Sequence, residues 1–158
     1  MNNKYVKLHS LLRMLGALLA IIVFISMFAT KMVVSSNEHL DFFYDFRYGA
    51  FFGDDGVTGN VFGFFGHLFV LLGGLAGLAF VFIDELIGKD LTKKLAFVAG
   101  GLALAGALLI LLFAPIFIAM NNLKQCTTGA GPIVFGIFGL IVGVINIAAP
   151  ILEDKGNK

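Results

Sequence analysis

The sequence has no tryptophan, one cysteine and three prolines, and only 13% of its 158 residues are charged. A soluble domain carries about 25% charged residues, so this chain has too few to cover a surface facing water. The single cysteine, Cys126, excludes an internal disulfide and any cysteine-based metal cluster. The net charge is only +1 and the basic residues form no stripe, which excludes a nucleic-acid-binding protein.

Hydrophobic residues are abundant instead: they make up 59% of the chain, and the mean hydropathy is +0.96. They gather in four long runs with almost no charge, at about residues 11–34, 61–83, 95–120 and 132–149. A helix of about 20 residues crosses the hydrocarbon core of a bilayer, which is about 30 Å thick. We therefore predict an all-α, polytopic membrane protein. Its single domain, residues 1–158, would be a bundle of four transmembrane helices joined by connections at 35–60, 84–94 and 121–131.

The first run follows the basic start MNNKYVKLHSLLR, which is also how a secretory signal peptide begins. The apolar stretch continues to Val34, however, and the only acceptable cleavage pattern is Val34-x-Ser36. We therefore expect a retained transmembrane span.

Glycines recur at close spacing along the second and fourth runs. Where a membrane helix has no side chain, a neighbouring helix can approach until the two backbones nearly touch. The glycines predicted to pack helices are Gly59, Gly63, Gly66, Gly73, Gly77, Gly136, Gly139 and Gly143. Because glycines and other small residues occur on several faces, we expect some of them to contact a second copy or another membrane protein.

The connection 35–60 is rich in carboxylates and phenylalanines. Four polar residues follow the spacing i, i+3, i+4 and i+7, namely Asp41, Tyr44, Asp45 and Tyr48. This spacing predicts a short amphipathic helix that lies in the membrane–water interface on the outer side.

The same connection brings oxygen and imidazole donors together at Glu38, His39, Asp41 and Asp45. Their spacing matches no metal-ligand pattern, so a solvated loop is favoured over a cation site.

The distribution of lysine and arginine predicts the orientation. Eight of these residues lie in the N-terminal segment up to Arg13, in the connection 84–94 or after the fourth run. The other three lie at the opposite side of the bundle, and they are Lys31 near the end of the first run, Arg47 and Lys124. Cytoplasmic segments carry the excess of positive charge. We therefore expect a multi-pass protein of the cell membrane with both termini in the cytoplasm.

The sequence VFGFFG at 61–66 recurs as VFGIFG at 134–139. Both copies open a run that begins at the outer side. Duplication of a two-helix hairpin is one explanation, and a shared solution to one packing problem is the other.

Few polar groups lie inside the runs. His67, Asn146, Ser26 and Thr30 could line a polar pathway for a small solute, since buried polar groups in membrane proteins often mark transport routes. Hydrogen bonds between helices are the more ordinary role for His67 and Asn146.

No HExxH, GxSxG or phosphate-binding loop is present, so we expect no enzyme, no metal and no cofactor. The four-span outline is that of claudins and tetraspanins. The marker residues of these families are missing, however, because the sequence has no tryptophan and the first outer connection has no cysteine pair. We therefore assign the chain to neither family. The prediction is a structural, accessory or assembly subunit that contacts lipids and a second copy or another membrane protein. The alternative is a small-solute channel or transporter, acting alone or as an oligomer.

Overall fold

The computed structural model describes residues 3–35, 49–53 and 57–156 and confirms the predicted all-α class. The elements in chain order are α1 (Asn3–Ala29), β1 (Val33–Ser35), α2 (Gly49–Phe52), α3 (Phe62–Ile87), α4 (Lys89–Met120), β2 (Cys126–Thr128) and α5 (Ala130–Gly156). The helices α1, α3, α4 and α5 are each long and apolar enough to cross a membrane. The chain is therefore a multi-pass membrane protein built on a four-helix bundle.

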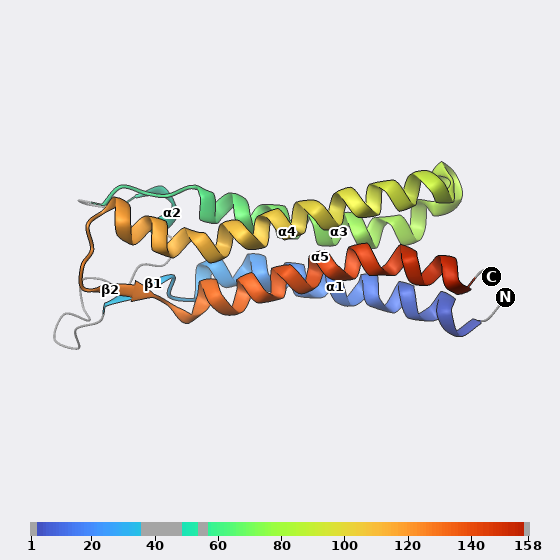
Figure 1. Ribbon diagram of the computed structural model, residues 1–158, viewed down its shortest axis with the longest axis horizontal. Coiled ribbons are helices and arrows are strands. Elements are labelled where there is room, and N and C mark those ends of the chain that lie inside the picture. The colour runs from blue at the N-terminus through green and yellow to red at the C-terminus, as the bar shows by residue number, and fades with distance from the viewer. Residues whose placement is uncertain (1–2, 36–48, 54–56, 157–158) are drawn as a thin grey trace.

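The four long helices run alternately in opposite directions, side by side (Figure 1). Around the bundle the order is α1, α3, α4 and α5, so that α1 and α4 each pack against both α3 and α5. Both chain termini and the α3–α4 turn lie at one end, which we call the terminal end. The strands β1 and β2 lie at the opposite end, which we call the strand end.

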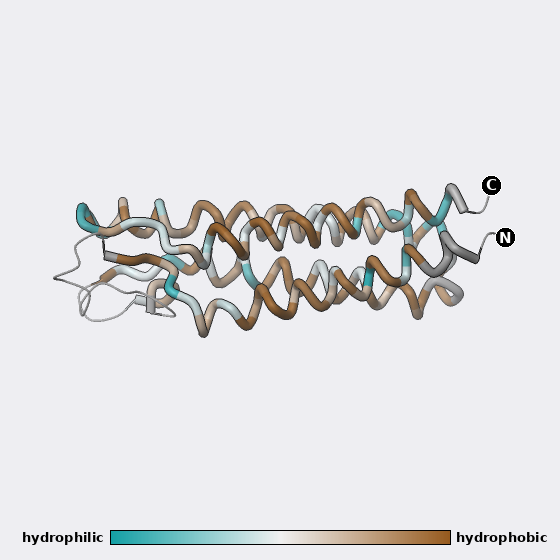
Figure 2. Tube along the Cα trace, turned by 90° about the horizontal axis from the view of Figure 1, so that it is seen from below, coloured by the Kyte–Doolittle hydropathy of each residue, from teal (hydrophilic) through white to brown (hydrophobic). Residues whose placement is uncertain are grey.

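Apolar residues cover the outside of the bundle as well as its interior. The middle of the helices is predominantly hydrophobic, and hydrophilic residues concentrate toward the two ends (Figure 2). Exposed leucine, isoleucine, valine and phenylalanine side chains occur on all four long helices. This surface suits lipid, because in water a continuous apolar face of that size would associate.

The first span is shorter than predicted at the strand end. We expected helix up to Val34, but α1 stops at Ala29 and residues 33–35 pair antiparallel with residues 126–128. The Thr30 hydroxyl donates a hydrogen bond to the Ser26 carbonyl (2.8 Å), where the helix ends. Val33 and Val34 are β-branched and pack well on a sheet. A small sheet thus joins two connections that the sequence predicts as separate loops.

Two other helices are longer than predicted, both at the terminal end. The helix α4 begins at Lys89 rather than near residue 95, directly after Gly88, whose φ of 84° fits a helix stop. The helix α5 continues through Pro150 to Gly156 rather than ending at Ala149. Proline removes one backbone hydrogen bond. The last turn of α5 also forms ion pairs with α1 and α4, which stabilise the continued helix.

The centre of the bundle is narrow because its buried residues are small. Ala20 of α1, Ala103 and Ala107 of α4 and Val142 of α5 form one buried cluster with their neighbours. Larger side chains fill the strand end, where Phe51 of α2 packs with phenylalanines of α4.

Candidate functional site

Asn146 joins two helices that face each other diagonally across the bundle. It is 2% exposed, and its Nδ2 donates a hydrogen bond to the Gly73 carbonyl of α3 (2.9 Å). Its Oδ1 lies against Gly77, one turn further along α3, where a Cβ would collide with it. The pair Gly73 and Gly77 therefore forms a recess for one amide side chain, and that amide serves helix packing.

All eight glycines that the sequence singles out lie against atoms of this same chain. A Cβ on Gly66 would come within 2.8 Å of the Gly106 carbonyl oxygen, and one on Gly106 within 2.6 Å of the Gly66 carbonyl oxygen. A Cβ on Gly73 would come within 2.7 Å of the Ala99 carbonyl oxygen of α4. The remaining predicted glycines, Gly59, Gly63, Gly77, Gly136, Gly139 and Gly143, also have neighbours too close for a side chain.

Sequence analysis missed Gly106, because nothing in the sequence indicates which face of α4 meets Gly66. The two copies of the repeated motif lie at the strand end, and both pack on α4. Gly66 meets Gly106, and Gly139 meets Ala107, the next residue along α4. The repeat therefore provides two similar surfaces for one helix placed between them.

His67 is fully buried near the strand end. Its Nδ1 lies 2.7 Å from the Gly63 carbonyl oxygen of the same helix. A carbonyl only accepts, so Nδ1 carries the proton and Nε2 is left as an acceptor. Nε2 is buried and has no hydrogen-bond partner among the described residues. The ring packs edge-on against Phe51 of α2, with ring centroids 5.7 Å apart.

Ser26 and Thr30 bond to the backbone of their own helix. The Ser26 hydroxyl donates to the Val23 carbonyl (2.6 Å), and the Thr30 hydroxyl donates to the Ser26 carbonyl. No hydrogen bond recorded among the described residues links any two of the side chains of Ser26, Thr30, His67 and Asn146. Neither the pocket at the strand end nor the small one at the terminal end is lined by any of them.

The segment before α3 is held at the strand end by α2 and by the end of α4. Phe51 is fully buried between Gly63 and Phe113, and its ring centroid lies 4.9 Å from that of Phe113. Asn121, just after α4, accepts a hydrogen bond from the Thr58 N–H (2.7 Å) and donates one to the Thr58 carbonyl (2.9 Å). This part of the first connection is therefore an integral part of the bundle.

The predicted interfacial helix with Asp41, Tyr44, Asp45 and Tyr48 lies outside the described residues, as do Glu38 and His39. The nearest described helix is α2, which begins at Gly49. Ala50 of α2 is buried against the bundle.

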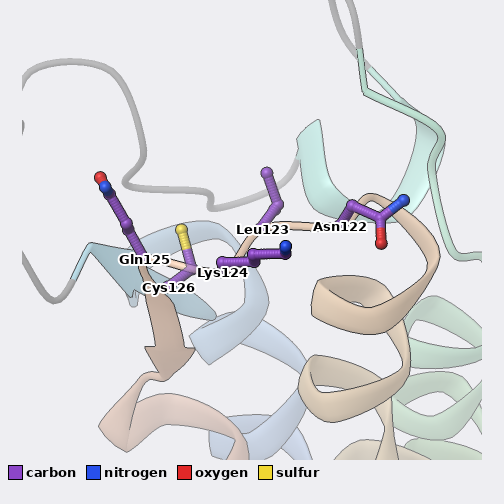
Figure 3. Close-up of a pocket in the computed structure, with 5 residues that line it drawn as sticks. All are labelled: Asn122, Leu123, Lys124, Gln125 and Cys126. Carbon is purple, nitrogen blue, oxygen red and sulfur yellow. The ribbon is translucent and has the colours of Figure 1, made fainter.

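A cavity of about 290 Å³ opens at the strand end between the end of α4 and β2. It is lined by Asn122, Leu123, Lys124, Gln125 and Cys126 (Figure 3). Gln125 and Cys126 point to one side of this connection, and the Lys124 side chain extends away from them. The lining residues are consecutive, from Asn122 after α4 to Cys126 at the start of β2, and no set of three metal-ligating side chains occurs among the described residues.

The outward face of α4 carries one glycine that contacts no other part of the described chain at its Cβ position. Gly101 is exposed, and no heavy atom lies within 4 Å of the place that its Cβ would take. Among the described glycines inside the spans, only Gly101 is open in this way. Ala105, one turn further, is also exposed, while Val98 and Leu108 border the pair.

Charged groups gather at the terminal end. Arg13 of α1 is 2% exposed, although its place near a membrane boundary predicts a side chain that reaches water. It pairs with Glu153 of α5 (3.8 Å), and Lys93 of α4 pairs with Asp154. The last turn of α5 is thereby fastened to both of its neighbours.

No family model matches the chain, and neither a curated protein nor a solved structure does.

Proposed function

We propose that the protein is a structural or assembly subunit of a cell membrane that associates with a second copy or another membrane protein through the outward face of α4. The observation that carries this proposal is the open position of Gly101, with Ala105 one turn away. Two small residues four apart let a partner helix approach α4 closely, which is how membrane helices gain contact energy without a hydrophobic driving force.

The glycines that the sequence singled out do not support association between molecules, because they are all used in packing this bundle. Gly101 differs from them in having nothing of its own chain to contact. Glycine costs about 1 kcal/mol relative to alanine in a helix interior, so an outward glycine without a contact is a cost to the isolated bundle. A partner helix on this face would offset that cost.

Orientation is part of the same proposal. The terminal end holds Arg13, Lys89, Lys93 and Lys94, and the excess of lysine and arginine supports a cytoplasmic position for this end. The strand end with Cys126 would then face outward.

Gly101→Leu tests the proposal, because it fills this open position and its Cβ would have no heavy atom of the bundle within 4 Å. We expect the wild type in mild detergent to have a molar mass above that of one chain, or to retain a partner, as measured by light scattering on a sizing column. The Gly101→Leu variant should run as a single chain. Val144→Leu enlarges an exposed position on α5 and serves as the matched control, with wild-type mass expected. A wild type that runs alone with no partner would overturn the proposal.

Transport is the alternative, and one observation favours it. Nε2 of His67 is a buried acceptor with no hydrogen-bond partner among the described residues. Buried polar groups are nearly always hydrogen-bonded, so an unsatisfied one needs an explanation, such as binding of a solute. Ser26, Thr30 and Asn146, in contrast, each have a hydrogen-bond partner. Solute flux into liposomes tests this alternative. Unchanged flux with His67→Ala and Asn146→Leu would remove it.

A further inference from the structure

Two buried polar atoms at the strand end, Nδ2 of Asn60 and Nε2 of His67, have no hydrogen-bond partner among the described residues. Asn60 is 3% exposed and His67 is fully buried. The Asn60 Oδ1 accepts a hydrogen bond from the Phe62 N–H (3.1 Å), which fixes the orientation of the amide and leaves Nδ2 as an unsatisfied donor. Because Nδ1 of His67 bonds to the Gly63 carbonyl, Nε2 is an unsatisfied acceptor. One donor and one acceptor are therefore buried at this end without satisfaction.

The helix α2 covers both of these residues. Asn60, Gly63 and His67 follow the spacing i, i+3 and i+7, which places them along one face. Gly63 has no side chain, and the ring of Phe51 lies against the place that its Cβ would take. The same ring packs edge-on against His67. The Ala50 carbonyl accepts a hydrogen bond from the Asn60 N–H (3.0 Å). Residues 50 and 51 thus contact the chain at both unsatisfied groups.

The attachment of α2 to the bundle carries a cost. This helix of four residues lies at the strand end (Figure 1) and is followed by Gly53, whose φ of 87° allows the chain to turn back toward α3. A helix of this length is not stable by itself, so contacts with the bundle hold it in place. Those contacts bury Ala50 and Phe51 fully. If α2 moved away, this apolar burial would be lost, but water would reach Asn60 and His67 and offset part of the loss.

From these observations we infer that α2 is a lid that opens at the strand end and admits water to Asn60 and His67. Water suits both groups, because its oxygen accepts from the Asn60 amide and its O–H donates to the His67 imidazole. The closed arrangement is the major state and the open one a minor state. The inference depends on neither function proposed above, because the Gly101 face is a separate surface of α4 and the lid can open whether or not a solute crosses the bundle.

Thiol labelling of single-cysteine variants in mild detergent tests the inference. Each variant also carries Cys126→Ser, so the introduced cysteine is the only thiol. Ala50→Cys reports opening of the lid, because Ala50 is fully buried on α2, and Phe52→Cys gives the rate for an exposed thiol on the same helix. Val23→Cys lies in the buried centre of the bundle and reports opening of the whole bundle. The labelling rate of Ala50→Cys should lie between the other two, about tenfold or more from each.

His67→Leu is the decisive second change in the Ala50→Cys background. Leucine has no polar atom to hydrate, so opening becomes less favourable and labelling should slow about tenfold. His67→Met is a second apolar replacement and should have the same effect. Ser26→Ala is the matched control, because Ser26 is also buried near the strand end but already bonds to the Val23 carbonyl. Its labelling rate should equal that of Ala50→Cys alone.

Two results would overturn the inference. Equal labelling rates for Ala50→Cys and Val23→Cys would mean that α2 opens only together with the whole bundle. An unchanged rate with His67→Leu and His67→Met would mean that hydration of the imidazole contributes nothing to opening. Neither result depends on the molar mass measured for Gly101→Leu or on solute flux, so failure of one proposal leaves the others standing.

Discussion

At the scale of single residues, the centre of this bundle depends on the absence of side chains. Asn146 is accommodated only because Gly77 has no Cβ, and its amide finds the Gly73 carbonyl across the bundle. A buried amide costs free energy unless it is hydrogen-bonded. The Asn146 side chain therefore needs both the space that Gly77 leaves and the acceptor that the Gly73 carbonyl provides. The usual preference of helices for alanine over glycine is reversed at such a position.

Gly77→Ala should destabilise the bundle by about 1–3 kcal/mol, because the new methyl group collides with the Asn146 amide. The readout is thermal or denaturant unfolding in detergent. Gly101→Ala is the control, and it should be neutral or slightly stabilising, since its Cβ meets nothing. In the Asn146→Ala background, Gly77→Ala should cost much less. Equal costs in both backgrounds would contradict this explanation.

His67 presents the opposite case, because its Nε2 is a buried polar atom without a hydrogen-bond partner among the described residues. Leucine is close to histidine in size and carries no polar atom to satisfy. His67→Leu should therefore leave the free energy of unfolding within about 1 kcal/mol of wild type, or raise it. Asn146→Leu should lower Tm, because it removes the bond to Gly73 and overfills the recess. A loss in His67→Leu as large as that in Asn146→Leu would reveal a partner for Nε2.

At the scale of elements, the strand end is organised by short segments that local sequence hardly specifies. The helix α2 has only four residues, and β1 and β2 have three each. Each is too short to be stable alone. The helix α2 persists because Phe51 fills a space beside Gly63 and Phe113. The strands β1 and β2 persist because they pair with each other and because Val33 is buried in the same cluster as Phe51. Tertiary contacts thus define these elements.

Phe51→Ala should destabilise the protein by about 3–5 kcal/mol, the usual cost of removing a buried phenyl ring. Its neighbour Phe52 is 51% exposed, so Phe52→Ala should change the stability by about 0.5 kcal/mol or less. Comparing the two melting curves in the same detergent checks the assignment. Similar losses for both variants would mean that α2 does not anchor to the bundle through Phe51.

At the scale of the whole molecule, the two ends have different chemical character. The terminal end carries ion pairs that link α5 to α1 and to α4, and the strand end is closed by a small sheet and by aromatic packing. Between them, the outward surface is apolar along all four long helices. A bilayer therefore satisfies the middle of the molecule, and water or headgroups satisfy its ends.

Cys126 provides a direct test of orientation. In the orientation that we propose from the excess of lysine and arginine, the strand end faces outward, so a maleimide that cannot cross membranes should label Cys126 in intact cells. A reporter fused after Lys158 should stay inaccessible until the cells are permeabilised. The Cys126→Ser variant shows the background of labelling. Labelling that needs permeabilised cells, together with an accessible reporter, would reverse the orientation.

The sequence by itself determined that this is a helical membrane protein with four spans, because hydrophobic length is a local property that a bilayer imposes directly. It also marked Asn146 and eight glycines as packing groups, and it placed a short connection at residues 84–94. It predicted an interfacial helix around Asp41 and Tyr44 as well, which remains a prediction.

Only the tertiary structure decided that Gly77 receives Asn146, that Gly66 meets Gly106, that residues 33–35 leave the helix for a strand, and that α5 continues past Pro150. These features depend on how each helix is rotated about its axis and on what its neighbours offer, and hydrophobic periodicity constrains neither when lipid is as apolar as the core.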